Sequence, residues 1–338
     1  MRTVFVVDDN DTNLTMAEEA LEEYYRVIAL PSADKMFKAL EKHRPDLILL
    51  DIEMPQVSGF EALEELKGNP DFSGIPVIFL TSMNDEDNEV RGFELGAVDF
   101  VSKPFSKPVL LNRIKHHMHI DDVVRERTRQ LVLMQNGIVY TMADLVESRD
   151  QSTGGHIDRT SKYMKILIKA MMENEIYAAE MNDWDLDSVI SSARLHDVGK
   201  ISIPDSILNK PGKLTDEEFD KMKTHAEAGE RIIDQVIEIT GDAEFLYNAK
   251  MFAAYHHERW DGTGYPYGMA ETAIPLQGRI MAIIDVYDAL TTERPYKKAF
   301  THEKACEIIE EGKGSHFDPV VCEFFLKHEN EFKEAAVQ

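Results

Sequence analysis

Short apolar runs recur at regular intervals through the first 105 residues of the chain. Four of these runs are almost continuously apolar, and a fifth is weaker. They are TVFVVDD (3–9), DLILLDI (46–52), PVIFLTS (76–82), VDFVSKP (98–104) and the weaker YRVIAL (25–30). Amphipathic stretches such as NLTMAEEALEEY (13–24) and GFEALEELKG (59–68) lie between them. This alternation predicts an α/β doubly wound domain over residues 1–120, with a five-stranded parallel sheet covered by helices on both faces.

The segment from residue 107 to residue 150 contains only Pro108 and Gly137 as residues that disfavour a helix. Its apolar residues recur at helical spacings. They are Leu110, Ile114, Val124, Leu131, Met134, Ile138, Met142 and Leu145. We therefore expect a linker or signalling helix over residues 121–145. Its apolar stripe either pairs with the same helix of a second copy or packs on the chain's own domains, and we expect a homodimer.

From residue 140 onward the pattern is helical almost throughout, which predicts an all-α domain over residues 146–338. Polar residues interrupt the apolar helical stretches at five places. These places are STGGHIDRTSKYM (152–164), SARLHDVGK (192–200), MKTHAEAG (222–229), AAYHHERWDGTGYP (253–266) and RIMAIIDVYDAL (279–290). Because buried polar groups need partners, we expect these side chains to share a site.

Composition narrows the possible functions. The chain has 338 residues, enough for two domains, and its 62 acidic and 37 basic side chains give a net charge of −25. This balance excludes a typical DNA-binding protein, and an anionic substrate would need metal ions or a few well-placed Lys and Arg side chains. No apolar run approaches the roughly 18 residues needed to span a membrane.

The cysteines and the first residues of the chain indicate the cellular compartment to expect. Cys306 and Cys322 are the only cysteines, and neither belongs to a C-x-x-C pattern. The apolar stretch within MRTVFVVDDN is too short for a secretory signal. We therefore expect a reduced, cytoplasmic protein without a membrane anchor.

Chemically active side chains follow the predicted strands of the first domain. They are Asp8 and Asp9 after the first strand, Asp51 after the third, Thr81 and Ser82 after the fourth, and Lys103 after the fifth. The carboxyl ends of parallel strands meet at one edge of a sheet, where such folds bind ligands. Three carboxylates suit Mg²⁺, and a hydroxyl with an ammonium suits a phosphoryl group. The simpler alternative is that the acids only cap the helices that follow.

These residues resemble the receiver domain of two-component response regulators, over about residues 1–120. The resemblance implies that Asp51 accepts a phosphoryl group from a cognate histidine kinase. It also implies that Asp8 and Asp9 hold Mg²⁺ together with Asp51 and the backbone carbonyl of Glu53. Thr81 and Lys103 would bind the phosphoryl group, Phe100 would be the aromatic switch, and the Lys103–Pro104 peptide bond would be cis.

The polar residues of the second domain form a set of nitrogen and oxygen ligands without a thiolate. Taken one at a time, each histidine is more simply explained as a hydrogen-bonded core residue. Asp285, however, would be an unpaired acid in a core helix, and buried charges of that kind are paired or bind metals. A set of five histidines and two aspartates suits two transition-metal ions such as Fe or Mn rather than structural zinc.

The HDVGK stretch suggests how such a centre would work. Asp197 can bridge two ions through its two oxygens, and two ions about 3.5–4 Å apart can clamp a phosphate for in-line attack. Lys200 lies three residues after Asp197 and four after His196, so all three side chains can face one cavity. We expect the Lys200 ammonium to meet the phosphate rather than a metal, which makes Asp197 and Lys200 the candidate catalytic residues.

The blocks HDVGK, HHERWDGTGYP and DVYDALTTERPYKKAF resemble the HD-GYP branch of the HD phosphohydrolases, over about residues 135–335. The family hydrolyses the bacterial messenger cyclic di-GMP to linear pGpG, which some members cut on to GMP. The resemblance implies a dinuclear metal site whose ligands match the family motifs position by position. These ligands are His156, His196, Asp197, His225, His256, His257 and Asp285.

The same resemblance implies substrate contacts. Asp288, Arg294 and Lys297 match a block whose polar residues approach the nucleotide phosphates, although Arg294 and Lys297 are also compatible with a solvated helix face. Gly264, Tyr265 and Pro266 form a rigid turn just after two predicted metal ligands. This turn would line the substrate entrance, or it would be a docking surface for a diguanylate cyclase-type partner protein.

Two departures from the family pattern bear on the site. Some members hold a third metal with a glutamate four residues before the first histidine, where this chain has Ser152, so we expect two metals. The stretch MMENEIYAAEMNDWDLD (171–187) lengthens the interval between His156 and His196. We expect an insertion beside the site, with consequences for substrate access.

Three functional hypotheses follow from the sequence. The first is a phosphorylation-controlled phosphodiesterase that acts on cyclic di-GMP. The second is a nucleotide-binding or protein-interaction module without turnover, which the complete ligand set disfavours. The third is the same enzyme with pGpG or a cyclic GMP-AMP dinucleotide as its preferred substrate.

Overall fold

The computed structural model describes residues 1–337 except for 82–85, 151–154, 242 and 294–297. The chain divides into two compact units, Met1–Leu131 and Val132–Gln338. The division falls inside α5, one continuous helix from Lys107 to Arg149 that includes the predicted signalling segment. Each unit is described by itself. No helix in the described part of the chain is long and apolar enough to cross a membrane.

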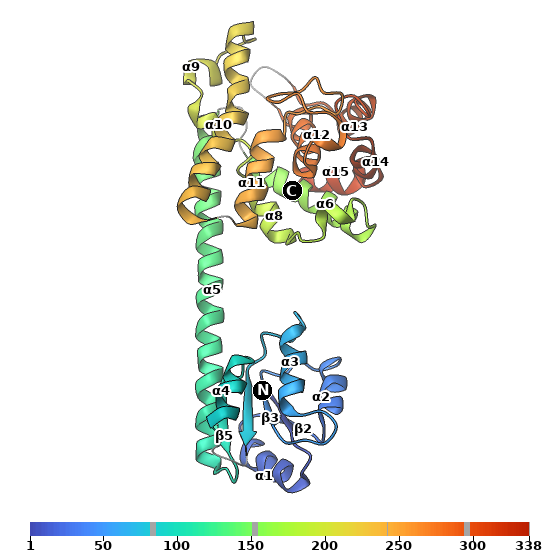
Figure 1. Cartoon of the computed structure of the whole chain (residues 1–338). Helices are drawn as coiled ribbons and strands as arrows, with labels where there is room; N and C mark the ends of the chain where they lie inside the picture. The colour runs from blue at the N-terminus through green and yellow to red at the C-terminus, as the bar shows by residue number, and fades with distance from the viewer. Residues whose placement is uncertain (82–85, 151–154, 242, 294–297, 338) are drawn as a thin grey trace. The chain divides into compact units, whose positions relative to one another are not determined.

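The first unit is the predicted doubly wound α/β domain (Figure 1). Its five parallel strands have the order β2-β1-β3-β4-β5. The strands are β1 (Thr3–Val7), β2 (Arg26–Leu30), β3 (Leu47–Asp51), β4 (Val77–Thr81) and β5 (Asp99–Ser102). The helices before α5 are α1 (Asp11–Leu21), α2 (Ala33–Leu40), α3 (Gly59–Gly68) and α4 (Glu86–Glu94).

Apolar side chains cover both faces of this sheet because successive residues of a strand point to opposite sides. In β1, Phe5 and Val7 pack with residues of α2 and α3, whereas Val4 and Val6 pack with residues of α1 and the first turns of α5. The strand register pairs Val7 with Leu50. This alignment brings the ends of β1 and β3 to the same edge of the sheet. The Lys103–Pro104 bond after β5 is cis, as predicted.

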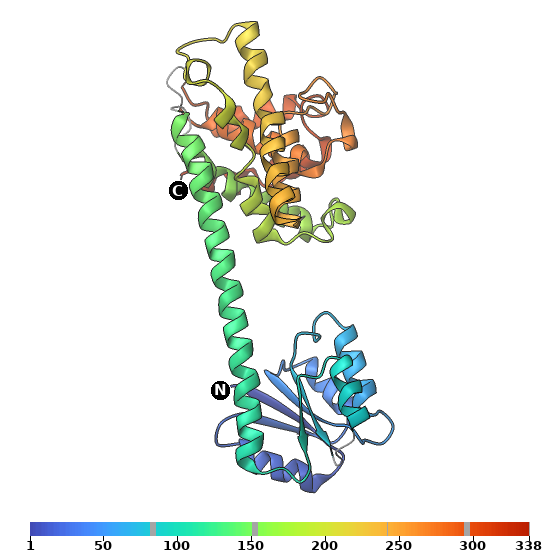
Figure 2. The same cartoon turned by 60° about the vertical axis from the view of Figure 1, so that its left-hand side comes forward.

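The second unit is helical, as predicted (Figure 2). Its longer helices after α5 are α6 (His156–Glu173), α8 (Leu186–Ala193), α10 (Asp216–Thr240), α11 (Glu244–Tyr255), α12 (Leu276–Thr291), α13 (His302–Glu311), α14 (Pro319–Lys327) and α15 (Glu329–Val337). Short helical turns complete it: α7 (Ala178–Met181), η1 (Val198–Ser202), α9 (Asp205–Leu208) and η2 (Glu271–Ala273). Within the described residues of this unit, extended pairing is limited to isolated bridges at Asp261–Ala270 and Lys313–Phe317.

Two apolar cores hold this unit together. The larger one surrounds α12 and includes Tyr163 of α6, Phe252 of α11 and Phe325 of α14. The smaller one joins the last turns of α5 to η1, α10 and α11, through residues such as Val139 and Val198. The last turns of α5 are therefore part of the core that surrounds the HDVGK segment.

The stretch 171–187 does not lie beside the predicted metal ligand His156, so its expected position next to the site was wrong, and its being an insertion stays a prediction. It includes the last residues of α6, and Glu173 is 17 residues after His156 in the same helix. At 1.5 Å per residue, this separation is about 25 Å. The segment instead packs on the larger core, where the Tyr177 hydroxyl donates a hydrogen bond of 2.9 Å to the Asp318 carboxylate.

Candidate functional site

The first unit gathers three carboxylates at the carboxyl edge of its sheet. Oxygen atoms of Asp8, Asp9 and Asp51 all lie within 4.8 Å of one another. The Lys103 Nζ atom lies 2.6 Å from Asp8 Oδ2 and 2.7 Å from Asp51 Oδ1. Asn13, which was missed from the sequence, donates hydrogen bonds of 3.0 Å to both oxygens of Asp8. This arrangement has the oxygen ligands for Mg²⁺ and the ammonium for a phosphoryl group.

Burial controls the charge of Asp51. Burial raises the pKa of the Asp51 carboxyl and the neighbouring Asp8 carboxylate adds to the rise, although Lys103 partly opposes both. The backbone N–H of Glu53 donates a hydrogen bond to this carboxylate, which places the Glu53 main chain beside it. A divalent cation among these acids would favour the ionised carboxylate, which is the form that can attack a phosphoryl group.

The predicted switch residues lie next to this cluster. Thr81 is the buried last residue of β4, and Ser82 lies outside the described residues. Phe100 is buried, and its ring centroid lies 5.5 Å from that of Phe79 and 4.9 Å from that of Phe93 in α4. The aromatic ring therefore occupies the space between β4 and α4, which is a placement compatible with a switch role.

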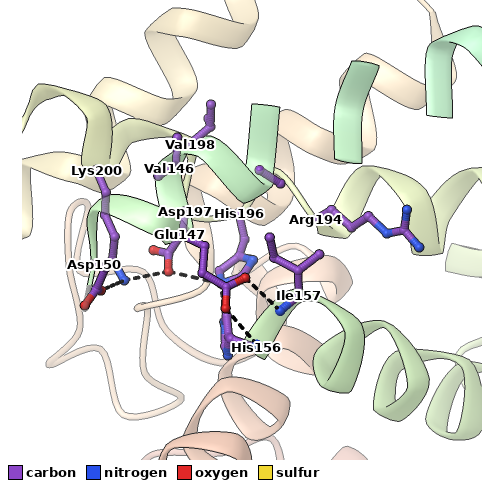
Figure 3. Close-up of a pocket in the computed structure, with 11 residues that line it drawn as sticks. Val146, Glu147, Asp150, His156, Ile157, Arg194, His196, Asp197, Val198 and Lys200 are labelled. Carbon is purple, nitrogen blue, oxygen red and sulfur yellow. Dashed lines mark hydrogen bonds and ion pairs between the residues drawn. The ribbon is translucent and has the colours of Figure 1, made fainter. Parts of the chain in front are cut away.

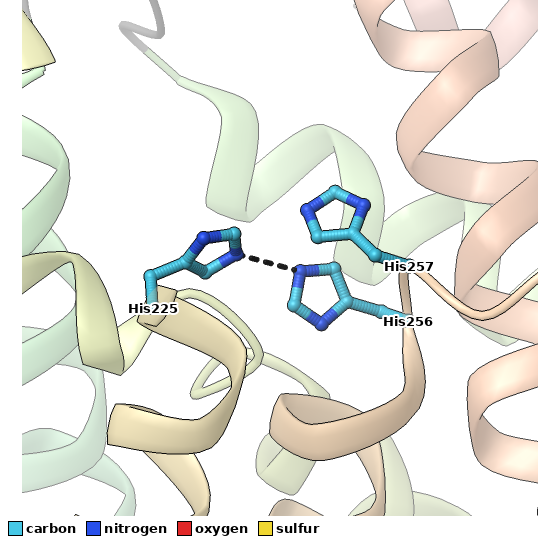
Figure 4. A group of neighbouring side chains, drawn as sticks. All are labelled: His225, His256 and His257. Atoms are coloured by element: carbon cyan, nitrogen blue, oxygen red, sulfur yellow. Dashed lines mark hydrogen bonds between the residues drawn. The ribbon is translucent and has the colours of Figure 1, made fainter. Parts of the chain in front are cut away.

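In the second unit, three histidines form one ligand group (Figure 4). His225 belongs to α10, His256 caps the carboxyl end of α11 and His257 follows it. The Nε2 atoms of His225 and His256 are 3.3 Å apart. Their Nδ1 atoms lie 2.7 Å from the Met222 carbonyl and 2.9 Å from the Phe252 carbonyl. These backbone acceptors favour the tautomer with a proton on Nδ1, which leaves each Nε2 lone pair available for a metal.

His156, His196 and Asp285 form a second ligand group. His156 is the first residue of α6, His196 follows α8, and Asp285 lies in the middle of α12. The His156 Nε2 atom lies 3.2 Å from His196 Nε2 and 3.8 Å from Asp285 Oδ1. The His196 Nδ1 atom faces the Ala193 carbonyl at 3.0 Å, which again leaves Nε2 directed at the group.

Asp197 lies between the two groups. Its Oδ1 atom is 3.5 Å from His225 Nε2 and 3.7 Å from His256 Nε2, whereas its Oδ2 atom is 3.4 Å from His196 Nε2. One oxygen therefore faces each ligand group, as a bridging carboxylate requires. Burial opposes ionisation of Asp197, but the charges of Lys200 and His196 outweigh it and hold the pKa of this carboxyl well below its usual range.

Burial lowers the pKa of both His256 and His257 well below the usual value, and neighbouring histidines of the two ligand groups add to the effect. Burial also acts to lower the pKa of His156, but the Asp288 and Asp285 carboxylates outweigh it and raise that pKa. Neutral imidazole is the form that binds metals. Each ligand group contains only nitrogen and oxygen donors. The residues present therefore fit two transition-metal ions, which Asp197 would be placed to contact together, and they include no thiolate of the kind common in structural zinc sites.

Lys200 contacts the candidate bridging ligand (Figure 3). Its Nζ atom lies 2.7 Å from Asp197 Oδ2 and 3.3 Å from Asp150 Oδ2. Burial opposes the charge of this ammonium, but Asp197 and Asp150 outweigh it and raise the pKa of Lys200. The sequence predicted that Lys200 would meet the phosphate rather than a metal, and the structure adds that its ammonium neutralises the carboxylate between the two ligand groups.

Comparisons with known proteins agree with this architecture. The chain matches the family model of the response regulator receiver domain over residues 4–115 and that of the HD domain over residues 140–321. The second match spans more than half of the chain. The chain belongs to the HD-domain response regulator family. Receiver domains bind Mg²⁺, and HD domains are metal-dependent hydrolases.

Three relatives illustrate the sequence similarity of this HD-domain response regulator to other proteins. It is 41% identical to the "Probable cyclic di-GMP phosphodiesterase" of Vibrio cholerae serotype O1, over 99% of this chain and 79% of that protein. It is 31% identical to the "Cyclic di-GMP phosphodiesterase response regulator RpfG" of Xanthomonas campestris pv. campestris, over 96% of this chain and 87% of that protein. The "3'3'-cGAMP-specific phosphodiesterase 2" of Vibrio cholerae is 40% identical, over 58% of this chain and 35% of that protein.

Asp288 does not lie where the sequence analysis placed it. The residue is only 2% exposed. Its Oδ2 atom lies 2.7 Å from His156 Nδ1, and its Oδ1 atom accepts a hydrogen bond of 2.6 Å from Arg159 Nε. Both oxygens thus have partners behind the His156 ring, so the placement argues against the expected contact with nucleotide phosphates. Asp288 instead orients the ring and supports its basicity. Arg294 and Lys297, expected to approach the phosphates, and Ser152 lie outside the described residues.

The GTGYP turn places an aromatic ring at the site. The Tyr265 ring centroid lies 4.7 Å from that of His257, and Tyr265 lines one cleft together with Asp197 and Lys200. Gly264 approaches the backbone of Glu258 so closely that a Cβ atom there would lie 2.5 Å from the Glu258 Cα atom. Pro266 follows a cis peptide bond. Of the two roles considered for this turn, the placement of Tyr265 favours the substrate entrance.

Three acids near the site were missed from the sequence. Glu147, near the end of α5, accepts hydrogen bonds from the backbone N–H groups of His156 and Ile157, at 2.9 and 3.3 Å (Figure 3). Asp150 pairs with Lys200, as described above. Glu258 is buried and accepts hydrogen bonds from the Tyr267 and Met269 N–H groups, at 2.7 and 2.9 Å. Glu147 binds the N–H of a residue 9 positions later, and Glu258 binds loop residues 9 and 11 positions later, so the local spacing identifies neither set of partners.

Proposed function

We propose that this HD-domain response regulator is a cyclic di-GMP phosphodiesterase with a dinuclear metal centre, and that phosphorylation of Asp51 controls it. The observation that carries the proposal is the position of Asp197, with one carboxylate oxygen toward each of two ligand groups. When bound, two ions supply charge that neutralises a phosphodiester and lower the pKa of the attacking water. Fe and Mn suit the nitrogen and oxygen donors.

The chain's own residues would orient the substrate. Lys200 lines the cleft with an ammonium that can hydrogen-bond a phosphate oxygen, which is a strong charge-assisted contact. Tyr265 presents an aromatic ring beside His257, where it would exclude water and give a base or ribose a surface to pack against. Asp288 holds the His156 ring in place from behind. The reaction would open the cyclic dinucleotide to linear pGpG, with further hydrolysis to GMP as a second step.

The substrate assignment rests on the relatives. Two of them, aligned over nearly the whole chain, are named for cyclic di-GMP, and this favours the same substrate here. A relative of the second unit is named for 3'3'-cGAMP, and this supports a cyclic GMP-AMP dinucleotide as the second candidate. Both substrates have the same two phosphodiester linkages in one ring, so the metal centre and Lys200 would act on them alike.

Product analysis tests the proposal directly. The reduced protein, loaded with Fe²⁺ or Mn²⁺, is incubated with cyclic di-GMP, pGpG and cyclic GMP-AMP in separate reactions, and the products are separated by chromatography. We expect cyclic di-GMP to give pGpG fastest, with no product from Asp197→Ala. Faster turnover of cyclic GMP-AMP would replace the substrate assignment. Binding without turnover of any of the three would favour the interaction-module hypothesis.

Phosphorylation of Asp51 has its own test. Incubation with acetyl phosphate and Mg²⁺ should label the wild-type protein as an acyl phosphate, and Asp51→Asn should abolish the label. The reason is that the Asp51 carboxylate lies beside Lys103 and the two other acids that would hold Mg²⁺. Equal labelling of the two proteins would contradict the assignment. A cognate histidine kinase would be the donor in the cell.

The exposed face of α5 supports a homodimer. Val124, Leu131, Ile138 and Leu145 recur every seven residues and are 56%, 61%, 53% and 60% exposed. A seven-residue repeat of apolar residues is the pattern that pairs two helices in a coiled coil. Leu131→Glu together with Ile138→Glu should therefore convert a dimer into a monomer in sedimentation experiments, whereas Arg127→Glu on the same helix should not. A monomeric wild-type protein would contradict the pairing.

A further inference from the structure

A second group of metal-binding side chains lies in the helical unit, on α13 and α15, separate from the ligands described above. It consists of His302, Cys306 and Glu329, whose ligand atoms all lie within 4.8 Å of one another. His302 and Cys306 are one turn apart on α13, so their side chains share a face, and Glu329 is the first residue of α15. Cys306 is buried, whereas the other two are half-buried.

The distance between the sulfur and the nearer imidazole nitrogen of this group matches that of a tetrahedral metal site. The Cys306 Sγ atom lies 3.6 Å from His302 Nε2. Metal–ligand bonds of about 2.3 Å to sulfur and about 2.0–2.1 Å to nitrogen place these two atoms about 3.5 Å apart in a tetrahedral zinc site. The separation of these two atoms therefore suits a common ion, which the His302 ring would reach by rotating about its side-chain bonds.

The buried Tyr287 orients the histidine of this group. Its hydroxyl lies 2.9 Å from His302 Nδ1, which leaves Nε2 as the ring nitrogen available to an ion. The Cys306 Sγ atom lies 3.6 Å from Nε2 and 3.9 Å from Nδ1, beside the ring, so a turn of the ring would direct the Nε2 lone pair toward an ion held by the sulfur. A partner on the far side of the ring is the usual way in which proteins fix a metal-binding histidine. The three residues also line a cavity with Glu303 and Asn330, which leaves room for water as a fourth ligand.

Cys322 shows what a purely structural cysteine looks like in this fold. It is buried in α14, and its Sγ atom lies 3.5 Å from the Ile309 carbonyl oxygen. It belongs to none of the candidate metal-binding groups found among the described residues. Cys306, in contrast, has an imidazole nitrogen and a carboxylate within ligand distance. The two cysteines therefore form a matched pair for an experiment.

We propose that His302, Cys306 and Glu329 form a second metal site that binds Zn²⁺. A thiolate, an imidazole and a carboxylate suit Zn²⁺, whereas the nitrogen and oxygen set around Asp197 suits Fe or Mn. On binding, the thiol proton leaves to solvent and the sulfur forms a bond to zinc. The thiolate and the Glu329 carboxylate then balance the two positive charges of the ion, so the site as a whole is neutral.

The position of this site gives it a structural consequence. The bound ion would join α13 to α15, and its histidine contacts Tyr287 of α12. The next residue of α12 is Asp288, which holds His156 in place. Zinc at this site would therefore stabilise the packing of α13 and α15. These helices lie beside the part of α12 whose Asp288 supports the proposed dinuclear centre.

Cobalt is the probe that separates this site from the other candidate centres. Co²⁺ replaces Zn²⁺ with the same ligands, and bonds between Co²⁺ and a thiolate give a charge-transfer band in the near ultraviolet. The ligand groups around Asp197 and Asp51 contain no sulfur and cannot produce this band. The reduced protein is stripped of metal with a chelator and titrated with Co²⁺. We expect the band in the wild-type protein, with loss on addition of excess Zn²⁺.

Variants assign the band to its ligands. Cys306→Ser should abolish it and Cys322→Ser should retain it. His302→Ala, which keeps the thiol, should weaken Co²⁺ binding at least tenfold, and Glu329→Gln should weaken it more than Glu331→Gln in the same helix. The band should survive in Asp197→Ala, so the result does not depend on the proposed phosphodiesterase activity. Circular dichroism on every variant identifies any that has lost its helices.

Two results would overturn the proposal. One is the absence of a thiolate band in the folded wild-type protein at saturating Co²⁺. The other is a band that survives in Cys306→Ser or disappears equally in Cys322→Ser. If Cys306→Ser does not fold, the comparison of His302→Ala with wild type decides, and unchanged Co²⁺ affinity in that variant would reject the site.

Discussion

Both units place carboxylates around a lysine, but the first unit does so at the edge of a sheet and the second does so between helices. In the first unit, Asp8, Asp51 and Lys103 come from the ends of parallel strands that meet at one edge of a sheet. In the second, Asp197 and Lys200 meet imidazoles that several separate helices supply. The sheet dictates where its ligands meet, whereas the helical site depends on the packing of every helix that contributes to it.

The pKa of Asp51 and the pKa of Asp197 are shifted in opposite directions because the two carboxyl groups have different charged neighbours. Burial and a neighbouring carboxylate raise the pKa of Asp51. Asp197 is also buried, but Lys200 and His196 hold its pKa well below the usual range. Asp197 is therefore held as a carboxylate by groups of the chain itself. A divalent cation beside Asp51 would favour its ionised form, which is the form that the proposed phosphoryl transfer requires.

The sharpest test of this contrast is Asp197→Ala. Removing the shared ligand leaves two groups of donors without the carboxylate between them, so two cations bound there would repel each other. We expect metal content to fall, and turnover of cyclic di-GMP to fall by at least about a thousandfold, because the effect of two metals on the phosphodiester is lost. Elemental analysis and steady-state kinetics measure the two effects.

Asp51→Asn is the matched control for that variant. It removes a carboxylate from the other site and should leave the metal content of the helical unit unchanged. It should still abolish labelling by acetyl phosphate. If Asp51→Asn lost transition metal to the same extent as Asp197→Ala, the assignment of the two ion types to separate sites would be wrong.

Lys200→Ala should produce the next largest effect. The substitution removes one charge-assisted contact, worth about 1.5–3 kcal/mol. If Lys200 makes this contact chiefly in the transition state, turnover falls roughly ten- to a hundredfold. Metal content should stay near that of the wild type because Lys200 is not a ligand. A loss of metal as complete as in Asp197→Ala would show that the ammonium mainly stabilises the Asp197 carboxylate.

The contrast between scaffolds also explains what the sequence alone could predict. Asp8, Asp51 and Lys103 were placed correctly at one edge because apolar strands and their ends are visible in the pattern. The helical ligands were first singled out as polar residues inside apolar helices, but their individual roles came from the family resemblance, because periodicity does not show which turns of different helices meet. Glu147 and Glu258 were missed for that reason.

Asp288 also shows that the sequence pattern of one helix does not reveal what each of its side chains contacts. Asp285 and Asp288 lie three residues apart on α12, and the family resemblance implied a metal-ligand role for the first and a contact with the nucleotide phosphates for the second. In the structure Asp285 belongs to a ligand group, whereas Asp288 hydrogen-bonds His156 and Arg159 behind it. The distinction depends on how α6 packs against α12, and no pattern within α12 contains that information.

Asp288→Asn tests the assigned role. The amide keeps the shape of the side chain but removes the charge that orients His156 and supports its basicity. We expect metal affinity or turnover to fall about tenfold, as is typical when a partner of a metal-binding histidine is lost. Metal titration and kinetics check this, with Asp158→Asn in the first turn of α6 as the control. A change in KM alone, with metal affinity intact, would instead support the original expectation of substrate contact.

Glu258→Gln should have the smallest effect, and Glu61→Gln is its counterpart in the first unit. Each carboxylate accepts backbone hydrogen bonds: Glu258 from Tyr267 and Met269 in the loop after Tyr265, and Glu61 from Ser58 at the start of α3. Glu258 is buried, so replacing its charge weakens two charge-assisted hydrogen bonds and should destabilise the protein by about 1–3 kcal/mol.

The loop after Tyr265 should then become less well ordered, which raises KM a few-fold and leaves kcat and metal content close to wild type. Glu61 is solvent-exposed, so water replaces the lost interaction and Glu61→Gln should change neither the thermal midpoint nor KM measurably. Thermal unfolding and steady-state kinetics on the two variants make the comparison. Equal effects from both would mean that Glu258 acts only as an ordinary cap, and that the order of this loop does not limit substrate binding.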